Sequence, residues 1–235
     1  MGEHQAEIKF TFAGDGVAAA ISSYDLDRAA ADRRTIYFLD ERAGTGLRLF
    51  DAGLVLRLRG HGEDTGDTTL KLRPAPADRL TGRWQPGTEH KDEYRVEYDW
   101  ARKPVLAASV VADLKPDDLA ELVAGDRKPK DAFTDEQLDF LKRCGPGLDH
   151  PFRGLHLAGP ITALRWSGLT WPGSADLRAE QWTYSGDRTF LELSLKVAFA
   201  EAPAYRDLLT ADIEHRGLRI DDATTKTETV LRDLL

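Results

Sequence analysis

Strict alternation of hydrophobic and polar residues marks much of this chain as β-strand. In residues 6–12 every even position is apolar, and the odd positions carry Glu7, Lys9 and Thr11. A period of two is typical of a strand that buries one face. Strand signals recur further along the chain, in residues 35–39, 54–59, 69–73, 93–100, 161–169, 177–184 and 190–199.

Turn and helix signals separate these segments. Residues 61–67 are rich in Gly, Asp and Thr and predict a long loop that joins two strands into a hairpin. Residues 74–91, with several prolines and glycines, predict a second loop. Helices are predicted in residues 17–31, in residues 203–214 and at the C-terminal end.

The middle of the chain, roughly residues 106–147, changes character. Acidic residues follow Pro116 and Thr134, which is the signal of a helix start at each place, and glycines around Pro146 close the segment. Many strands in hairpin order, with helices in the middle and at the ends, indicate an α+β domain built on an antiparallel sheet.

Charge and cysteine content restrict the function classes. The 235 residues carry a net charge of -8, so the surface as a whole would repel nucleic acid and anionic membranes, and any bound anion needs a local basic site. The single Cys144 excludes an intramolecular disulfide and a cysteine zinc cage. We find no signal-peptide pattern and no apolar stretch of about 20 residues, so we expect a cytoplasmic protein without membrane or nucleic-acid partners. The oligomeric state stays open.

The polar face of the strands carries charged residues at successive positions. Arg57 and Arg59 alternate with leucines in one strand, and Lys71 and Arg73 do so in the next. In a single strand, a solvated face with paired charges is the ordinary explanation. Taken together, repeated like charges would repel one another unless something compensates them. A barrel that turns this face inward, around a polyanion and a metal ion, provides that compensation while helices cover the leucine face.

Several pieces of the sequence, in their order, resemble the CYTH, or triphosphate tunnel metalloenzyme, family. They are Glu7-Ile8-Lys9, Tyr37, Leu54-Val55-Leu56-Arg57-Leu58-Arg59, Thr69-Leu70-Lys71-Leu72-Arg73, Glu93-Tyr94 and Leu191-Glu192-Leu193-Ser194-Leu195-Lys196. The resemblance covers nearly the whole chain. It implies one domain over residues 1–235 with an α+β fold: a closed or nearly closed antiparallel β-barrel, helices packed outside it, and the helical insert at about residues 106–147.

The resemblance also implies roles for individual residues. The side chains expected to line the tunnel and bind phosphate oxygens are Lys9, Arg57, Arg59, Lys71, Arg73, Arg165 and Lys226. Guanidinium groups clamp two oxygens at once and lysine acts as a point charge, which suits a flexible polyphosphate. The carboxylates expected to hold Mg²⁺ or Mn²⁺, hard cations that prefer oxygen ligands, are Glu7, Glu93, Glu192 and Glu180, with Glu97 as a further candidate. For Glu180 and Glu97 a salt-bridged or exposed role is an open alternative. Glu7, Lys9 and Arg59 are the expected catalytic residues.

Two positions depart from the family pattern. The hallmark Glu-x-Glu-x-Lys strand of the family has Gln5 at its first position here, and the late acidic strand has Ser194 where a second Glu is expected. Both changes replace an anionic metal ligand by a neutral group, which affects the affinity or the number of metal ions.

The function we predict is metal-dependent hydrolysis of a triphosphate-containing small molecule: inorganic tripolyphosphate, thiamine triphosphate or a nucleoside triphosphate. One alternative is a class IV adenylate cyclase, which would make cyclic AMP from ATP in the same tunnel. The other is a polyphosphate or nucleotide sensor without turnover, which Gln5 and Ser194 favour. No glycine-rich loop matches the P-loop or the dinucleotide fingerprint.

Overall fold

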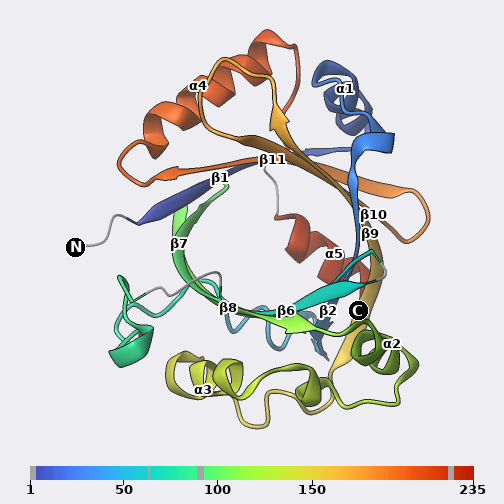
Figure 1. Cartoon of the computed structure of the whole chain (residues 1–235), viewed down its shortest axis with the longest axis vertical. Coiled ribbons are helices and arrows are strands. Elements are labelled where there is room, and N and C mark those ends of the chain that lie inside the picture. The colour runs from blue at the N-terminus through green and yellow to red at the C-terminus, as the bar shows by residue number, and fades with distance from the viewer. Residues whose placement is uncertain (1–3, 63, 89–92, 222–224) are drawn as a thin grey trace.

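The computed structural model describes residues 4–62, 64–88, 93–221 and 225–235, and its centre is a closed barrel of nine strands (Figure 1). In spatial order the barrel runs β1 (Gln5–Ala13), β11 (Arg188–Ala198), β10 (Leu177–Tyr184), β9 (His156–Leu169), β2 (Asp32–Asp40), β5 (Leu54–His61), β6 (Thr65–Leu72), β8 (Pro104–Leu114) and β7 (Tyr94–Trp100). The short strands β3 (Arg42–Ala43) and β4 (Gly46–Leu47) form a separate two-stranded sheet.

Neighbouring barrel strands are antiparallel except at one seam. There β1 pairs with β7 in parallel, with Glu7 beside Asp99, while β1 also pairs with β11 in antiparallel register. The predicted α+β fold with a closed barrel is therefore confirmed, and the barrel is mixed at this seam. Closure leaves the long sheet without an exposed edge.

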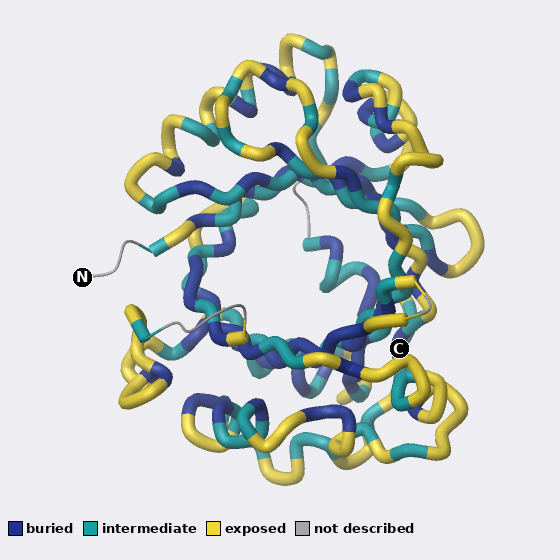
Figure 2. Tube along the Cα trace, viewed as in Figure 1, coloured by how far each residue is buried: buried dark blue, intermediate teal, exposed yellow. Residues whose placement is uncertain are grey.

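Helices cover the outer face of the barrel, where the alternating leucines pack. Figure 1 shows α2 (Pro116–Ala124) and α3 (Asp135–Cys144) against one side, and α1 (Asp15–Ser23) and α4 (Ala202–His215) against the other. Leu54, Leu56 and Leu58 are at most 1% exposed and belong to one core cluster with Phe140 of α3. Figure 2 shows the resulting pattern, with buried residues along the strands and exposed residues along the outer helices and loops.

The helix α5 (Lys226–Leu234) differs from the other four because it packs on inward-facing residues. Its Val230 and Leu231 join the core cluster of Phe38 and Trp182, two residues whose side chains also line the central cavity. In the view of Figure 1, α5 lies within the ring of strands. The side chain of Thr225 accepts a hydrogen bond from the backbone N–H of Glu228 and thereby caps the first turn. The predicted C-terminal helix is confirmed, and it lies at the tunnel.

The predicted helical insert begins later than expected. Residues 106–114 belong to β8, which pairs with β6 and β7, so the helical part starts at Pro116. The alanine-rich sequence of β8 favours helix locally, but pairing with strands on both sides decides its conformation. The prediction of one helix over residues 17–31 is likewise corrected: α1 ends at Ser23, and a short 3-10 turn, Arg28–Ala30, follows.

The hairpin loop predicted at residues 61–67 is much shorter, because Thr65 to Asp67 already pair with β5. Gly66, which suggested a turn, is instead a strand residue at a close backbone approach. A Cβ atom at this position would lie 2.7 Å from the carbonyl oxygen of Arg59 and 3.0 Å from that of Leu114. Asp67 therefore belongs to the barrel wall.

No helix within the described ranges has the combined length and apolar character that crossing a membrane requires.

Candidate functional site

The barrel encloses a cavity of about 880 Å³ that is lined from all nine strands and from α5. Its described lining contains eleven basic side chains, Lys9, Arg34, Arg57, Arg59, Lys71, Arg73, Arg95, Arg165, Arg178, Lys196 and Lys226. It contains five carboxylates, Glu7, Glu97, Asp99, Glu180 and Glu192. A protein with a net charge of -8 thus concentrates positive charge inside its barrel. A cavity of this kind attracts anions.

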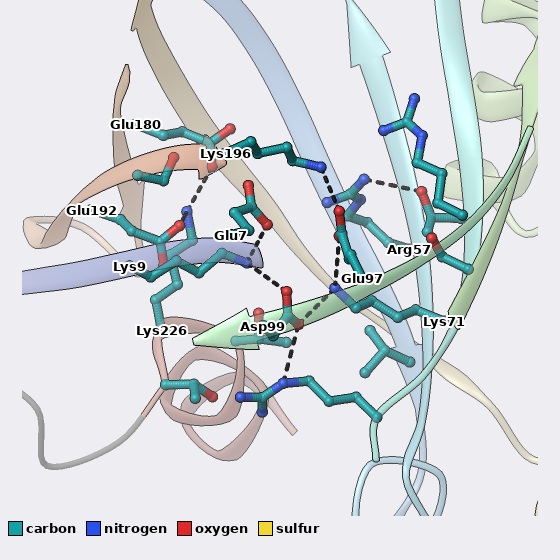
Figure 3. Close-up of a pocket in the computed structure, with 18 of the residues that line it drawn as sticks. Glu7, Lys9, Arg57, Lys71, Glu97, Asp99, Glu180, Glu192, Lys196 and Lys226 are labelled. Carbon is teal, nitrogen blue, oxygen red and sulfur yellow. Dashed lines mark hydrogen bonds and ion pairs between the residues drawn. The ribbon is translucent and has the colours of Figure 1, made fainter. Parts of the chain in front are cut away.

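The first group of charged residues gathers where β1 meets β7. Asp99 accepts contacts from Lys9, at 3.3 Å, and from Lys71, at 2.7 Å, and lies 3.1 Å from Nε of Arg73 (Figure 3). Glu7 lies 2.8 Å from Nζ of Lys9. The parallel pairing of β1 with β7 brings these residues together.

These ion pairs govern the protonation of the group. Burial alone would raise the pKa of Asp99, but Lys71 and Lys9 outweigh it and hold that pKa well below its usual range. Burial likewise opposes ionisation of Glu7, yet Lys9 and Lys196 lower its pKa to about 2. Burial would lower the pKa of Lys9, and Asp99 and Glu7 raise it instead. Glu7, Lys9 and Asp99 are therefore charged at neutral pH.

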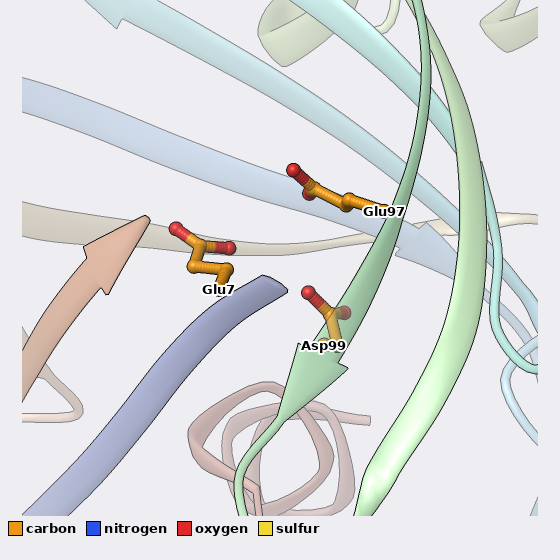
Figure 4. A group of neighbouring side chains, drawn as sticks. All are labelled: Glu7, Glu97 and Asp99. Atoms are coloured by element: carbon orange, nitrogen blue, oxygen red, sulfur yellow. The ribbon is translucent and has the colours of Figure 1, made fainter. Parts of the chain in front are cut away.

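The carboxylates of this group fit a hard divalent cation. One oxygen from each of Glu7, Glu97 and Asp99 lies within 4.8 Å of the others, and the three side chains converge (Figure 4). Oxygen ligands of this kind suit Mg²⁺ or Mn²⁺. These carboxylates already contact lysines, including Lys196, which lies 2.6 Å from Glu97. A bound cation would therefore replace ammonium contacts.

A second group forms around Lys226 at the start of α5. Its Nζ lies 2.6 Å from Glu180 and 3.0 Å from Glu192, which are paired across β10 and β11, and 4.2 Å from the ring centre of Trp182. Burial would raise the pKa of Glu180, but Lys226 lowers it to about 2. Although burial opposes the charge of Lys226, Glu180 and Glu192 raise its pKa. This lysine is 7% exposed and connects α5 to the tunnel wall.

The third group, which we call the arginine group, consists of Arg34, Arg57, Arg59 and Arg165. Asp67 is its nearest carboxylate, 2.7 Å from Nε of Arg59 and 3.9 Å from Arg57. Within the described part of the chain, no carboxylate pairs with Arg34 or Arg165 at ion-pair distance. Burial and the neighbouring Arg59 lower the pKa of Arg57 to about 10.

Donors in the arginine group lack acceptors. The buried Nε atoms of Arg34 and Arg57 have no hydrogen-bond partner. Burial, together with the charges of Arg59 and Arg165, also lowers the pKa of Arg34. Unpaired buried donors and clustered like charges are unfavourable unless an anion binds them. The arrangement is chemically suited to hold phosphate oxygens.

The structure brings most of the predicted site residues into this one cavity. They are Glu7, Lys9, Arg57, Arg59, Lys71, Arg73, Arg165, Glu180, Glu192 and Lys226, together with Gln5 and Ser194. Their functional roles stay predictions. Glu93 is the exception: it is exposed, precedes the first residue of β7 and does not line the cavity. The expectation that Glu93 faces the tunnel is therefore corrected, and Glu97 and Asp99, which follow it in the sequence, lie in β7 and face inward.

Sequence reasoning missed several residues of the site. Asp99 continues the polar alternation of Glu93 and Glu97, and this alternation was the available signal. Lys196 stood on the polar face of its strand without an assigned role. Arg34 and Asp67 lie near the first residues of β2 and β6, and the strands predicted from the sequence pattern began only after them. Whether these two side chains belong to the barrel wall depends on where each strand starts, and local sequence defines strand ends poorly.

Comparison with known proteins supports the fold. A scan against protein-family models and a search of curated proteins find no match. Among solved structures, a Hippeastrum protein described as a candidate adenylyl cyclase with a dominant triphosphatase activity superposes with a TM-score of 0.63 at 13% identity, over 97% of this chain and 96% of that one. A Bacillus halodurans protein described as a candidate adenylate cyclase gives a TM-score of 0.63 at 14% identity, over 97% of this chain and 98% of that one. At these identities the likeness concerns the fold alone, and it agrees with the closed barrel that the sequence resemblance implied.

Proposed function

We propose that this chain hydrolyses a triphosphate-containing small molecule with the help of Mg²⁺ or Mn²⁺. The observation that carries the proposal is the composition of the cavity: eleven basic side chains against five carboxylates, in one enclosed space. The substrate candidates are inorganic tripolyphosphate, thiamine triphosphate and nucleoside triphosphates. The triphosphatase activity ascribed to the Hippeastrum protein of the same fold favours hydrolysis.

In this proposal the two sides of the cavity have different tasks. Arg57, Arg59 and Arg165 bind phosphate oxygens through their guanidinium forks, because these groups have few carboxylate partners of their own. Lys9 and Lys71 turn from carboxylates to the remaining phosphate oxygens and neutralise their charge.

Glu7, Glu97 and Asp99 would hold the divalent cation. When bound, that cation supplies charge neutralisation at the phosphate oxygens. Glu180 and Glu192, proposed from the sequence as further metal ligands, hold Lys226 in this structure. Glu7, Lys9 and Arg59 remain the proposed catalytic residues, because they present charge to the cavity from opposite walls, β1 and β5.

Binding without turnover is the second candidate. Lysines neutralise the carboxylates of the cavity, and the neutral Gln5 and Ser194 also line it. A tunnel in which lysines outcompete the metal would bind the anion without cleaving it. A cyclase reaction, suggested by the descriptions of both proteins of this fold, uses the same phosphate contacts and differs in its product.

A phosphate-release assay tests the proposal. We expect tripolyphosphate, thiamine triphosphate or a nucleoside triphosphate to release phosphate with Mg²⁺ or Mn²⁺ and not with a chelator. Arg59→Ala should abolish most turnover, whereas Lys142→Ala, a matched control on the exposed side of α3, should behave as wild type. Cyclic AMP and pyrophosphate from ATP would identify a cyclase instead. Calorimetric binding of tripolyphosphate in chelator, without product from any substrate, would establish a sensor.

A further inference from the structure

A histidine lies beside the arginine group and has no role in the function proposed above. His61 is the last residue of β5, and its side chain lines the cavity on the same face as Arg57 and Arg59. Its Nε2 atom lies 2.5 Å from Oδ2 of Asp67 on β6. The family resemblance assigned neither residue a function.

Asp67 determines which ring nitrogen of His61 carries the proton. Burial would raise the pKa of Asp67, but Arg59 and Arg57 lower it, so the carboxylate is ionised at neutral pH. An ionised carboxylate is only an acceptor, so Nε2 must donate the hydrogen bond. In the neutral imidazole, Nδ1 is then left with its lone pair.

The same carboxylate places His61 next to the phosphate-binding side. Oδ2 of Asp67 accepts from Nε of Arg59, at 2.7 Å, as well as from His61, so the imidazole and the guanidinium are held side by side. Arg34 stands opposite His61 in the register of β2 with β5. A phosphate bound between Arg34 and Arg59 would therefore lie beside the imidazole.

The charged groups around His61 come from its own strand β5, from the adjacent strands β2 and β6, and from the next strands, β9 and β8. They are Arg57 and Arg59 from β5, Arg34 and Asp32 from β2, Asp67 from β6, Asp113 opposite Asp67 on β8, and Arg165 opposite Asp32 on β9. Asp67 is the carboxylate in contact with the ring. The environment thus holds one oriented imidazole among several phosphate-binding arginines.

We propose that His61 is a general base for the hydrolysis, with Asp67 as the positioning residue that fixes its tautomer. This inference rests on the proposed function. The oxygen of the attacking water forms a bond to the terminal phosphorus, while the bond from that phosphorus to its bridging oxygen breaks. The electron pair of the broken bond leaves with the bridging oxygen of the shortened product. The proton of the water passes to Nδ1 of His61 and from there to solvent.

The substitution His61→Gln tests this role. Glutamine can keep an N–H donor near the position of Nε2 and so retain the bond to Asp67, but it cannot act as a base. We expect kcat to fall by about 10²–10⁴-fold with a nearly unchanged KM. The matched control is His156→Gln, at an exposed position of β9 outside the cavity lining.

Two outcomes would overturn the proposal. If the wild type hydrolyses its substrate while His61→Gln retains the wild-type kcat, His61 is not the base, although the proposed function stands. If no wild-type phosphate release occurs with any triphosphate, the function and the base both fall. A second measurement needs no variant: ¹⁵N NMR of the wild type should show the neutral His61 ring protonated at Nε2. A ring protonated at Nδ1 would contradict the proposal.

Discussion

Asp99 is the residue at which most ion pairs of the first charged group meet. Its side chain is 5% exposed and contacts Lys9, Lys71 and Arg73. We expect Asp99→Asn to lower the free energy of unfolding by about 3–5 kcal/mol, because the substitution removes the charge of the buried carboxylate that three cations share. Urea unfolding measures this loss. The control Asp126→Asn, at an exposed position after α2, should change it by less than about 0.5 kcal/mol.

The same variant separates phosphate binding from metal binding. Without the charge of Asp99, the freed cations should bind tripolyphosphate more tightly in chelator, while the cluster of Glu7 and Glu97 should bind Mn²⁺ more weakly. Calorimetry with each ligand measures both effects. Weaker binding of both ligands would mean that Asp99 mainly shapes the cavity.

At this scale the sequence predicted the basic half of the site better than the acidic half. Lys9, Arg57 and Lys71 stand in the middle of strongly alternating strands, where a period of two already fixes the face. Whether Glu93 or Asp99 faces the cavity depends on where β7 begins in the barrel wall. Both residues share one face in the sequence pattern, and only tertiary structure places Glu93 beyond the start of the strand.

At the scale of elements, Lys226 connects α5 to the barrel wall. We expect Lys226→Gln to lower the free energy of unfolding by about 3–5 kcal/mol, because Glu180 and Glu192 lose the ammonium between them. Millimolar Mg²⁺ or Mn²⁺ should restore part of the loss by binding the two carboxylates. Thermal unfolding with and without metal measures both effects, with Lys142→Gln on α3 as control. A metal response equal to that of the wild type would show that these carboxylates do not take up a cation.

Elements with their own strong pattern could be predicted, whereas those defined by their neighbours could not. Helix α3 has a capping box from Thr134 and Gln137, and its start was predicted. Strand β8 lacks charged residues through most of its length. Small residues such as Ala107 and Ser109 occupy positions between its outward-facing apolar residues, so the strand shows no clear alternation of apolar and charged side chains. Its sequence therefore fits a helix as well as a strand, and pairing with β6 and β7 makes the difference.

At the scale of the whole molecule, the barrel separates an acidic exterior from a cationic interior. Binding of tripolyphosphate should therefore weaken as ionic strength rises, because salt screens the attraction between the anion and the tunnel. Calorimetry between about 0.05 and 0.5 M NaCl would measure this dependence. An affinity that is independent of the salt concentration would contradict a mainly electrostatic binding of tripolyphosphate.

Closure of the barrel is the whole-molecule feature that local sequence predicted least directly. The alternating charged faces predicted an interior in which a bound anion and a metal ion compensate the charges of the side chains. The family resemblance implied that this interior is a tunnel. The parallel seam of β1 with β7 joins segments about 90 residues apart and has no local signal. This seam builds the group of Glu7, Glu97 and Asp99, so this candidate metal site could be predicted only in part.

The buried carboxylates make the stability of the whole fold depend on pH at its acid end. The pKa values of Glu7 and Glu180 fall from 4.5 to about 2 on folding, and that of Asp99 falls below its usual range. A carboxyl group with a lowered pKa in the folded state contributes stability above its ordinary pKa and loses it as the pH falls toward the folded value. The free energy of unfolding should therefore be level above about pH 5 and decrease steadily from about pH 4.5 to 2. Urea unfolding across this range measures the decrease, and Asp99→Asn should make it shallower. An equal slope in the variant would place the acid sensitivity in carboxylates outside the tunnel.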